Sequence, residues 1–272
     1  MMTFATIIWD VNPEIFPSLF ENLPIHPRWY GVLFAVAFMV GFKIEEKIFA
    51  RENLKPEWVD SLFLTVLIGT ILGARLGHVF FYGWDYYSQN LGSILKIWEG
   101  GLASHGAIIG VIVSLWIWSK RVSKKPLLWI LDRSVIAIAF GGALVRLGNF
   151  FNSEIIGKPS DLPWAVEFAR LGDGIARHPS QIYEALAYLI SFVILYQAYW
   201  KYNKGQQRGF IFGMFMVLVF GFRFFVEFVK ENQEAFEDAY TLNMGQLLSI
   251  PVVIIGLYFI WNSFKAKKPD EA

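Results

Sequence analysis

Residues 141–157 read Gly141-Gly-Ala-Leu-Val-Arg146-Leu-Gly-Asn149-Phe-Phe-Asn-Ser-Glu154-Ile-Ile-Gly157, and they close an apolar run that begins near Leu127. At about 1.5 Å per residue, this run is long enough to cross a bilayer as a helix. An arginine three residues before an asparagine at the end of such a run is costly unless it faces a polar cavity or a partner. The alternative is an arginine whose charge reaches the membrane surface, followed by an ordinary loop. The stretch alone predicts a membrane-spanning helix and leaves both interpretations of Arg146 open.

The composition of the whole chain excludes an ordinary soluble domain. Of the 272 residues, 55% are hydrophobic, 18% aromatic and 17% charged, and the apolar residues fall in continuous runs rather than at amphipathic spacing. The chain has no cysteine, which excludes disulfides and cysteine-ligated metals. A net charge of +1 gives no sign of nucleic-acid binding, and no nucleic-acid partner is expected. No lysine or arginine precedes Arg28, so the N-terminus is expected to be mature chain rather than a signal peptide.

Seven apolar segments each approach the roughly 20 residues that a spanning helix needs. They lie at residues 29–45, 58–82, 102–119, 127–149, 180–200, 209–229 and 243–264. The first has the shortest apolar part, because Lys43, Glu45 and Glu46 interrupt its end. We therefore expect residues 1–272 to form a single all-α, polytopic integral membrane domain.

Basic residues are distributed unequally between the two sets of connections. The tail and the connections after the first, third and fifth segments hold 14 lysines and arginines, whereas the opposite connections hold 6 although they are longer. The positive-inside rule then places the N-terminus outside and the C-terminus in the cytoplasm. Two outside connections, residues 83–101 and 150–179, exceed a simple turn, and alternation within residues 162–170 suggests a short strand. These two segments predict a small extracytoplasmic cap.

Polar residues interrupt the apolar segments near the ends that this topology places outside. Polar helix ends occur in every membrane protein, but the cytoplasmic ends here lead mostly into lysine-rich loops, whereas these residues lie within apolar sequence. We therefore predict one polar cavity that opens to the outer leaflet. Its expected contributors are Arg28, Tyr30, Arg75, His78, His105, Arg146, Asn149, His178, Gln181, Glu184, Arg223, Glu227, Asn243 and Gln246.

The residue types in this predicted cavity suit an anion. Arg75, Arg146 and Arg223 offer planar, permanently charged forks that match phosphate or carboxylate. Glu227 follows Arg223 at i+4, so it is expected to hold that guanidinium in place, unless the pair only stabilises the helix. No histidine pair or carboxylate cluster has metal-ligand spacing, so neither a metal nor a cofactor is expected.

The histidines differ in what their surroundings indicate. His105 lies in Gly100-Gly-Leu-Ala-Ser-His105-Gly106, a glycine-lined entry to a helix where a substrate can approach closely. A lone histidine at such a site is more often structural than catalytic, so both roles stay open for it. His178 opens the sequence His-Pro-Ser-Gln, in which Ser180 is a candidate N-cap of the next helix.

Five motifs, in this order, resemble those of the bacterial prolipoprotein diacylglyceryl transferases. They are Trp29-Tyr30-Gly31, Ser104-His105-Gly106, the stretch from Arg146 to Gly157, His178-Pro-Ser-Gln-Ile-Tyr183-Glu184, and Arg223-Phe-Phe-Val-Glu227-Phe. Any one of them alone would be a weak signal, but five at compatible spacing are a strong one. The resemblance runs from about residue 26 to the last apolar segment.

This resemblance implies a multi-pass enzyme of the bacterial inner membrane, with its active site toward the outer leaflet. Such an enzyme moves the diacylglyceryl group of phosphatidylglycerol, a membrane lipid, to the lipobox cysteine of a prolipoprotein signal peptide. A thioether forms and glycerol phosphate leaves. By the same resemblance, Arg146 and Arg223 would hold the phosphate and His105 would be the candidate base. The other matching positions, expected to bind substrate, are Tyr30, Asn149, Glu154, Gly157 and Glu227.

The sequence departs from the commoner family pattern after the last motif. Lys230 stands where arginine is usual, and Glu231-Asn232 stands where Pro-Asp is usual. Lysine keeps the charge but loses the bidentate fork, so the role of Lys230 as a phosphate ligand stays open. The alternative from another class of protein is an outward-facing lipid or anion transporter. Transporters often show internal repeats and midplane sites, and the sequence has no obvious repeat.

Overall fold

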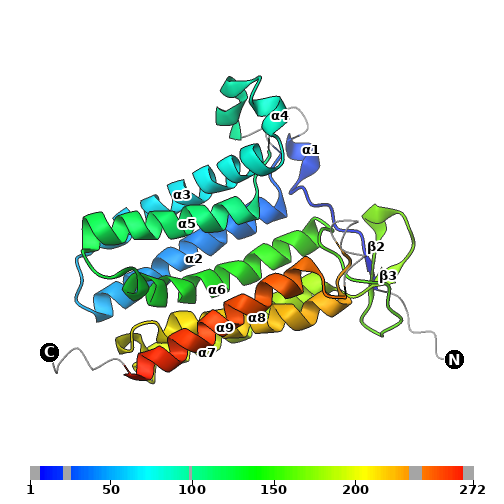
Figure 1. The fold of residues 1–272 in the computed structure, drawn as a ribbon. Helices are drawn as coiled ribbons and strands as arrows, with labels where there is room; N and C mark the ends of the chain where they lie inside the picture. Colours follow the sequence, from blue (N-terminus) through cyan, green and yellow to red (C-terminus); the bar gives the residue numbers. More distant parts are fainter. Residues whose placement is uncertain (1–6, 21–25, 98–99, 233–240, 266–272) are drawn as a thin grey trace. The chain divides into compact units, whose positions relative to one another are not determined.

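The structure is a computed structural model that describes residues 7–20, 26–97, 100–232 and 241–265 (Figure 1). The chain divides into two compact units. Unit 1 comprises Met1–Ile44 and Asp132–Ala272, and unit 2 comprises Glu45–Leu131. The boundaries between the units fall inside helices α2 (Trp29–Arg51) and α6 (Leu127–Phe151).

Six helices in the described part of the chain are long and apolar enough to cross a membrane. They are α3 (Glu57–Phe81), α5 (Ser104–Trp118) with the π-helical turn that follows it, α6, α7 (Ser180–Trp200), α8 (Phe210–Val226) with its 3-10 extension η6 (Glu227–Val229), and α9 (Met244–Lys265). Each lies within a few residues of a predicted apolar segment. The first predicted segment is helical too, as α2, but it falls outside this group of six. Helix α2 extends to Arg51 because lysine, glutamate and alanine are good helix formers.

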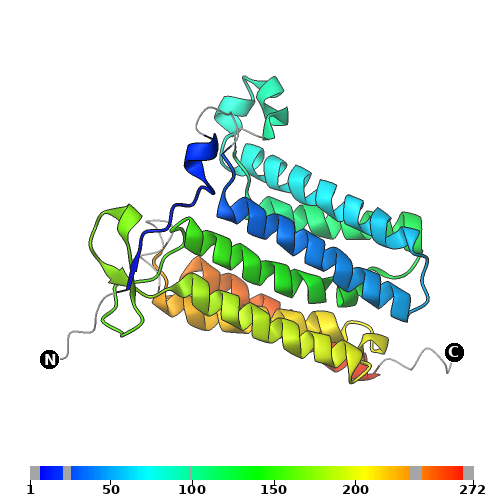
Figure 2. The same cartoon turned by 180° about the vertical axis from the view of Figure 1, so that it is seen from behind.

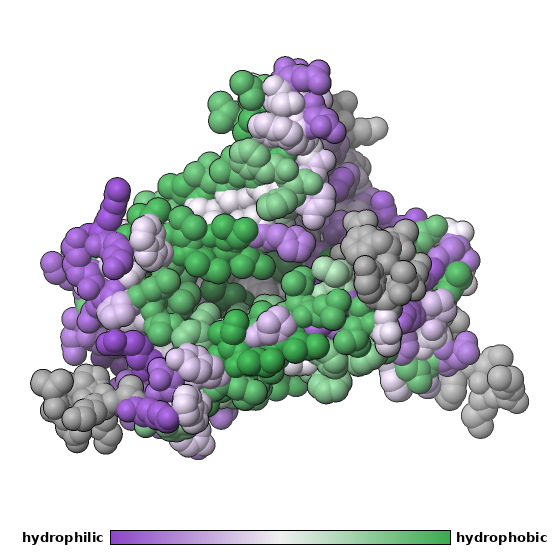
Figure 3. Space-filling view, in the orientation of Figure 1, coloured by the Kyte–Doolittle hydropathy of each residue, from purple (hydrophilic) through white to green (hydrophobic). Residues whose placement is uncertain are grey.

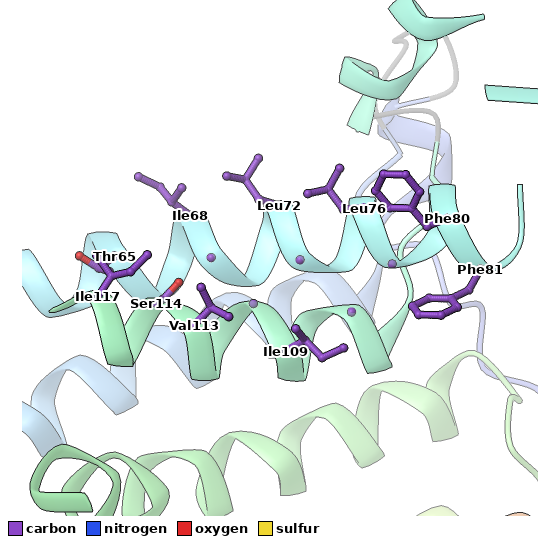
Figure 4. Close-up of a pocket in the computed structure, with 15 residues that line it drawn as sticks. Thr65, Ile68, Leu72, Leu76, Phe80, Phe81, Ile109, Val113, Ser114 and Ile117 are labelled. Carbon is purple, nitrogen blue, oxygen red and sulfur yellow. The ribbon is translucent and has the colours of Figure 1, made fainter. Parts of the chain in front are cut away.

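Helices α3 and α5 of unit 2 lie side by side (Figures 1 and 2). Their closest approach is between glycines, since a Cβ on Gly73 would overlap the carbonyl oxygen of Gly106 and lie 2.7 Å from the Cα of Gly110. Small residues at this four-residue spacing allow membrane helices to pack closely without a hydrophobic driving force. The exposed side of the pair is apolar, as Figure 3 shows. It contains a groove of about 740 Å³ between the side chains of α3 and α5 (Figure 4).

The connection after α3 is held by Arg75. It contains α4 (Trp84–Tyr87) and the 3-10 helix η1 (Leu91–Leu95). The Arg75 side chain is buried and donates hydrogen bonds to the carbonyl oxygens of Ser93 at 2.5 Å, Ile94 at 2.8 Å and Gly100 at 2.6 Å. The expectation that Arg75 offers a fork to an anion is therefore wrong, because backbone carbonyls already occupy its donors.

A three-stranded sheet belongs to unit 1, with the strand order β1-β2-β3. Strand β2 (Val166–Phe168) pairs in parallel with β1 (Ile7–Trp9) and antiparallel with β3 (Ala176–Arg177). Strand β2 lies inside residues 162–170, so the predicted strand is confirmed. Phe168 is fully buried, and Trp9 packs on Phe150 at 4.4 Å between ring centroids, which joins the sheet to the end of α6.

The start of α8 is fixed by Asp132 of α6. One carboxylate oxygen of this fully buried residue accepts a hydrogen bond from the N–H of Gly209 at 2.6 Å, and the other accepts one from the N–H of Phe212 at 2.9 Å. A carboxylate at this position satisfies free backbone donors and meets the positive end of the helix dipole. Helix α8 also packs against α7 and α9 (Figures 1 and 2). The helix that carries Arg223 is thereby tied to the helix that carries Arg146.

Candidate functional site

Arg146, near the end of α6, is held from its buried side by a carboxylate of α7. Its Nε lies 3.1 Å from Oε2 of Glu184, and its Nη1 donates to Oδ1 of Asn149 at 3.4 Å. The Glu184 side chain is 0% exposed, whereas that of Arg146 keeps 15% of its surface exposed. A guanidinium that pairs through Nε keeps most of its fork directed away from that partner. Glu184 therefore orients Arg146 without covering it.

The glycines on either side of Arg146 make room for tyrosine rings. A Cβ on Gly142 would lie 2.8 Å from the ring of Tyr188, and a Cβ on Gly148 would lie 2.7 Å from the ring of Tyr30. The Arg146 guanidinium carbon is 6.0 Å from the centroid of the Tyr188 ring. Aromatic side chains thus fill the space beside these glycines, and this packing brings Tyr30 of α2 next to the arginine-bearing helix.

The loop after α6 is organised around Glu154. Its carboxylate accepts hydrogen bonds from Nδ2 of Asn149 at 3.2 Å and from Nδ2 of Asn152 at 3.1 Å. Its carbonyl oxygen accepts one from Nε2 of the buried Gln181 at 2.6 Å. Arg146, Asn149 and Glu154 therefore form a continuous polar chain that the start of α7 holds in place.

Ser180 and Gly157, both singled out from the sequence, contact the backbone of neighbouring segments. Ser180 is the first residue of α7, and its hydroxyl donates to the carbonyl oxygen of Ile155 at 2.9 Å. The prediction that Ser180 is the N-cap is wrong, because Pro179 occupies that position. Gly157 forms a backbone bridge with Lys230, and a Cβ there would come within 2.6 Å of the His178 Cβ. Only glycine permits this approach.

Arg223 and Glu227 form the ion pair expected from their i, i+4 spacing. Nε of Arg223 lies 3.3 Å from Oε1 of Glu227, and the Arg223 side chain is 32% exposed. The other carboxylate oxygen of Glu227 accepts a hydrogen bond from Nδ2 of Asn243 at 3.1 Å. The predicted pairing is confirmed, and Asn243, the residue before α9, supports it.

Lys230 lies between the two carboxylates that hold the arginines. Its Nζ is 2.9 Å from Oε1 of Glu227 and 3.6 Å from Oε1 of Glu184, and its side chain is only 1% exposed. An ammonium group so enclosed is not open to a phosphate. We call the resulting set the charged cluster; in order of contact it consists of Arg146, Glu184, Lys230, Glu227 and Arg223.

The predicted site residues divide between the two units. Unit 2 holds His105, the second residue of α5, which is exposed and precedes the tightly packed Gly106. Unit 1 holds Tyr30, Arg146, Asn149, Glu154, Gly157, Arg223 and Glu227, together with Glu184 and Lys230, whose roles the sequence did not define. Among the described residues, no cluster of histidines and carboxylates could hold a metal ion.

The charged cluster has the chemistry of an anion site. Within the described part of the chain, each arginine pairs with a carboxylate through Nε, and neither Nη2 of Arg146 nor the two terminal nitrogens of Arg223 enter an ion pair. Such preorganised, partly exposed forks match the oxygen atoms of a phosphate. The two exposed arginine edges therefore define the candidate binding surface of unit 1.

Comparison with known proteins places this arrangement in a family. A family model described as prolipoprotein diacylglyceryl transferase matches residues 17–262. A protein of Chloroherpeton thalassium named phosphatidylglycerol–prolipoprotein diacylglyceryl transferase is 44% identical over 265 residues, which cover 97% of each chain. Proteins of the same name from Porphyromonas gingivalis and Tolumonas auensis are 44% and 41% identical to this chain. Each match covers 96% of this chain, and the matches cover 96% and 99% of the two relatives, respectively. The matched region contains every residue of the charged cluster.

Proposed function

The chain belongs to the prolipoprotein diacylglyceryl transferase family, and we propose that it moves the diacylglyceryl group of phosphatidylglycerol to the lipobox cysteine of a prolipoprotein. The observation that carries this assignment to particular residues is the charged cluster, in which Arg146 and Arg223 are held by buried carboxylates with their forks partly exposed. The names of the relatives support the transferase, and they give no support to the transporter alternative.

The reaction requires charge stabilisation on the phosphate. The cysteine sulfur forms a bond to the glycerol carbon of the diacylglyceryl group as the bond from that carbon to the phosphate oxygen breaks. The electron pair leaves with glycerol phosphate, so a phosphodiester with one negative charge becomes a monoester with more. Fixed guanidinium groups stabilise that developing charge more than they stabilise the bound lipid, which lowers the barrier. We assign this role to Arg146 and Arg223.

The thiol must also lose its proton. A cysteine thiol has a pKa of about 8.5, so it needs a base or a positive field to become a nucleophile. His105 is exposed at the start of α5 and is our candidate for the base, with lipid positioning as its alternative role. If it is the base, His105→Gln should abolish most turnover while lipid binding persists, and the wild-type rate should fall at low pH as the base becomes protonated. An active variant with an unchanged pH profile would leave only the positioning role.

The remaining predicted residues support the arginines. Asn149 and Glu154 continue the hydrogen-bonded chain from Arg146, and Glu227 holds Arg223. Tyr30 packs against the same helix, and Gly157 permits the backbone bridge to Lys230. We assign all five to the substrate site, where they keep the two forks directed toward one lipid head group.

We further propose that the single membrane domain has seven spans, with α2 as the first. Helix α2 is 23 residues long, and the unequal distribution of basic residues places the N-terminus outside and the C-terminus in the cytoplasm. In a bacterial inner membrane, this arrangement puts the exits of α6 and α8 at the outer leaflet. A reporter fused after Ala272 should then be cytoplasmic, and one inserted within residues 160–175 should be extracytoplasmic. Reporters on the same side would overturn this orientation.

The activity itself is tested with purified protein, labelled phosphatidylglycerol and a lipobox peptide. The expected product is a thioether-linked diacylglyceryl peptide, formed together with glycerol phosphate. The matched control is the same peptide with serine in place of the lipobox cysteine, which should remain unmodified. Movement of the lipid across a vesicle membrane without any modified peptide would favour the transporter and contradict the proposal.

A further inference from the structure

Lys230 and Glu184 are the two most enclosed members of the charged cluster, with side chains 1% and 0% exposed. Neither group can touch a lipid phosphate from such a position. A buried charge persists only where opposite charges and hydrogen bonds compensate for its lost hydration. Lys230 finds that compensation in the two carboxylates at 2.9 Å and 3.6 Å. Its contribution to the reaction must therefore pass through those carboxylates.

The carboxylate oxygens are divided between Lys230 and the arginines. Oε2 of Glu184 faces Nε of Arg146, and Oε1 faces Lys230. Oε1 of Glu227 faces both Lys230 and Nε of Arg223, while Oε2 accepts from Asn243. Without the lysine, the Oε1 atom of Glu184 would lose its only cation in this set. Arg146, which already pairs with Oε2 through Nε, is the other cation of the set that Glu184 contacts, and a phosphate needs the rest of its fork.

Lys230 also sets the charge of the cluster. The three cations and two carboxylates of the charged cluster leave one positive charge in excess, which matches the single negative charge of a phosphodiester. Removing the lysine charge makes the set neutral, so it no longer attracts an anion as a whole. Glu154 lies outside this count because it is exposed and its carboxylate is bonded to the amides of Asn149 and Asn152.

We propose that Lys230 is a positioning residue of the transfer reaction. It occupies the carboxylates of Glu184 and Glu227, which keeps the forks of Arg146 and Arg223 available to the phosphate. The inference rests on the proposed function and goes beyond it, because it assigns a catalytic consequence to a residue that does not contact substrate. An arginine at this position could bridge the same two carboxylates, so the shared requirement is a buried cation rather than a phosphate ligand.

The test compares kcat and KM of purified variants, together with thermal stability, in the thioether assay. Lys230→Met should lower kcat about 100-fold at a temperature where the variant is folded, with a smaller change in KM, as for loss of an interaction made in the transition state. Lys230→Arg should stay within a fewfold of wild type. Adding Glu184→Gln to Lys230→Met should recover at least about tenfold of the lost kcat, because the competing carboxylate is gone. Lys55→Met, a change of an exposed lysine in the connection between α2 and α3, is the control and should leave kcat unchanged.

Two results would overturn the inference. One is a folded Lys230→Met variant with kcat near wild type. The other is a loss that Glu184→Gln leaves unchanged, since carboxylate capture would then not be the cause. If Lys230→Met does not fold, Lys230→Gln, which retains hydrogen-bond donors without charge, is measured in its place with the same outcomes. A wild-type protein that forms no thioether would instead refute the proposed function, so the two failures are distinguishable.

Discussion

Arg75 in unit 2 and Arg146 in unit 1 occupy equivalent places in the sequence but differ in what surrounds them. Each lies near the end of a long apolar helix. Arg75 donates to the backbone carbonyls of Ser93, Ile94 and Gly100. Arg146 pairs through Nε with the carboxylate of Glu184 and retains an exposed edge. The first arginine organises a loop, whereas the second keeps donors that we propose bind a phosphate.

The difference shows how the partners of an arginine decide whether its donors stay available to a ligand. The connection after α3 bends back through Gly100 and Gly101, both with positive φ, and brings several carbonyl groups to Arg75. These carbonyl groups accept from Nε and from both terminal nitrogens, so all three nitrogens of the guanidinium are engaged. In unit 1 the carboxylates of Glu184 and Glu227 meet Nε of Arg146 and of Arg223, and Asn149 accepts from Nη1 of Arg146. The partner, rather than the arginine, decides which role is available.

Loss of Arg223 should give a large effect on function, comparable to that of losing Arg146. Arg223→Ala removes one exposed fork, and we expect turnover to fall about 10²–10³-fold, as when one preorganised donor to a developing charge is lost. The fold should persist, because Glu227 keeps Lys230 and Asn243 as partners. The measurement is thioether formation at saturating lipid, with Arg208→Ala in an exposed loop as the control. Turnover near that of the control would show that Arg223 is outside the site.

For Arg75 we expect a loss of stability rather than a loss of turnover. A lysine there keeps the charge but cannot reach three carbonyl groups, so Arg75→Lys should lower the free energy of unfolding by about 2–3 kcal/mol. Turnover per folded molecule should stay within a fewfold of wild type. Thermal unfolding in detergent, measured beside Arg121→Lys, separates the two quantities. A normal stability with a collapse of turnover would reverse the comparison between the two arginines.

The glycine contact between α3 and α5 should show an intermediate effect on stability. A Cβ at Gly73 would overlap the backbone of α5, so Gly73→Ala should lower the free energy of unfolding by about 1–3 kcal/mol through overpacking. Gly92→Ala is the matched control, because a Cβ at Gly92 meets no atom within 4 Å. Equal stabilities for the two variants would mean that the helices separate without loss and that unit 2 is not held by this contact.

The smallest effect is expected at Asp173, beside strand β3. A hydrogen bond from Arg177 holds the pKa of the Asp173 carboxyl below its ordinary value. The stabilisation is therefore present above that ordinary value of about 4 and is lost as the pH falls through the lowered pKa. When the pH is lowered from about 5 to about 3, the unfolding temperature should fall slightly more for wild type than for Asp173→Asn. Parallel curves would show that the contact does not contribute.

Local patterns in the sequence predicted much of the fold. The apolar segments from 58–82 onward gave helices with nearly the same bounds, because length and hydropathy decide which segments can span a membrane. The Arg223–Glu227 pair was predictable because helical spacing alone brings i and i+4 together. Strand β1 was not predicted, since three residues carry little pattern and its partner β2 lies far along the chain.

The contacts that define the candidate site could be predicted less well from the sequence. Arg146 and Glu184 lie on different helices, and Lys230, which meets Glu184, follows η6 and forms a backbone bridge with Gly157. No local rule pairs such residues, so the sequence presented Lys230 as a departure from the family pattern rather than as a link between two carboxylates. The same limit applies to Arg75, whose acceptors belong to a loop that hydropathy does not describe.

The central claim is that Arg146 recognises the departing phosphate with a bidentate fork that lysine lacks. The most direct measurement is the rate of thioether formation by purified Arg146→Lys at saturating phosphatidylglycerol, beside Arg75→Lys and with the stability of each determined. We predict that Arg146→Ala is nearly inactive and that Arg146→Lys recovers only a small fraction of the wild-type rate while the protein remains folded. An Arg146→Lys variant that works at the wild-type rate would contradict bidentate recognition and leave Arg146 as an interfacial anchor.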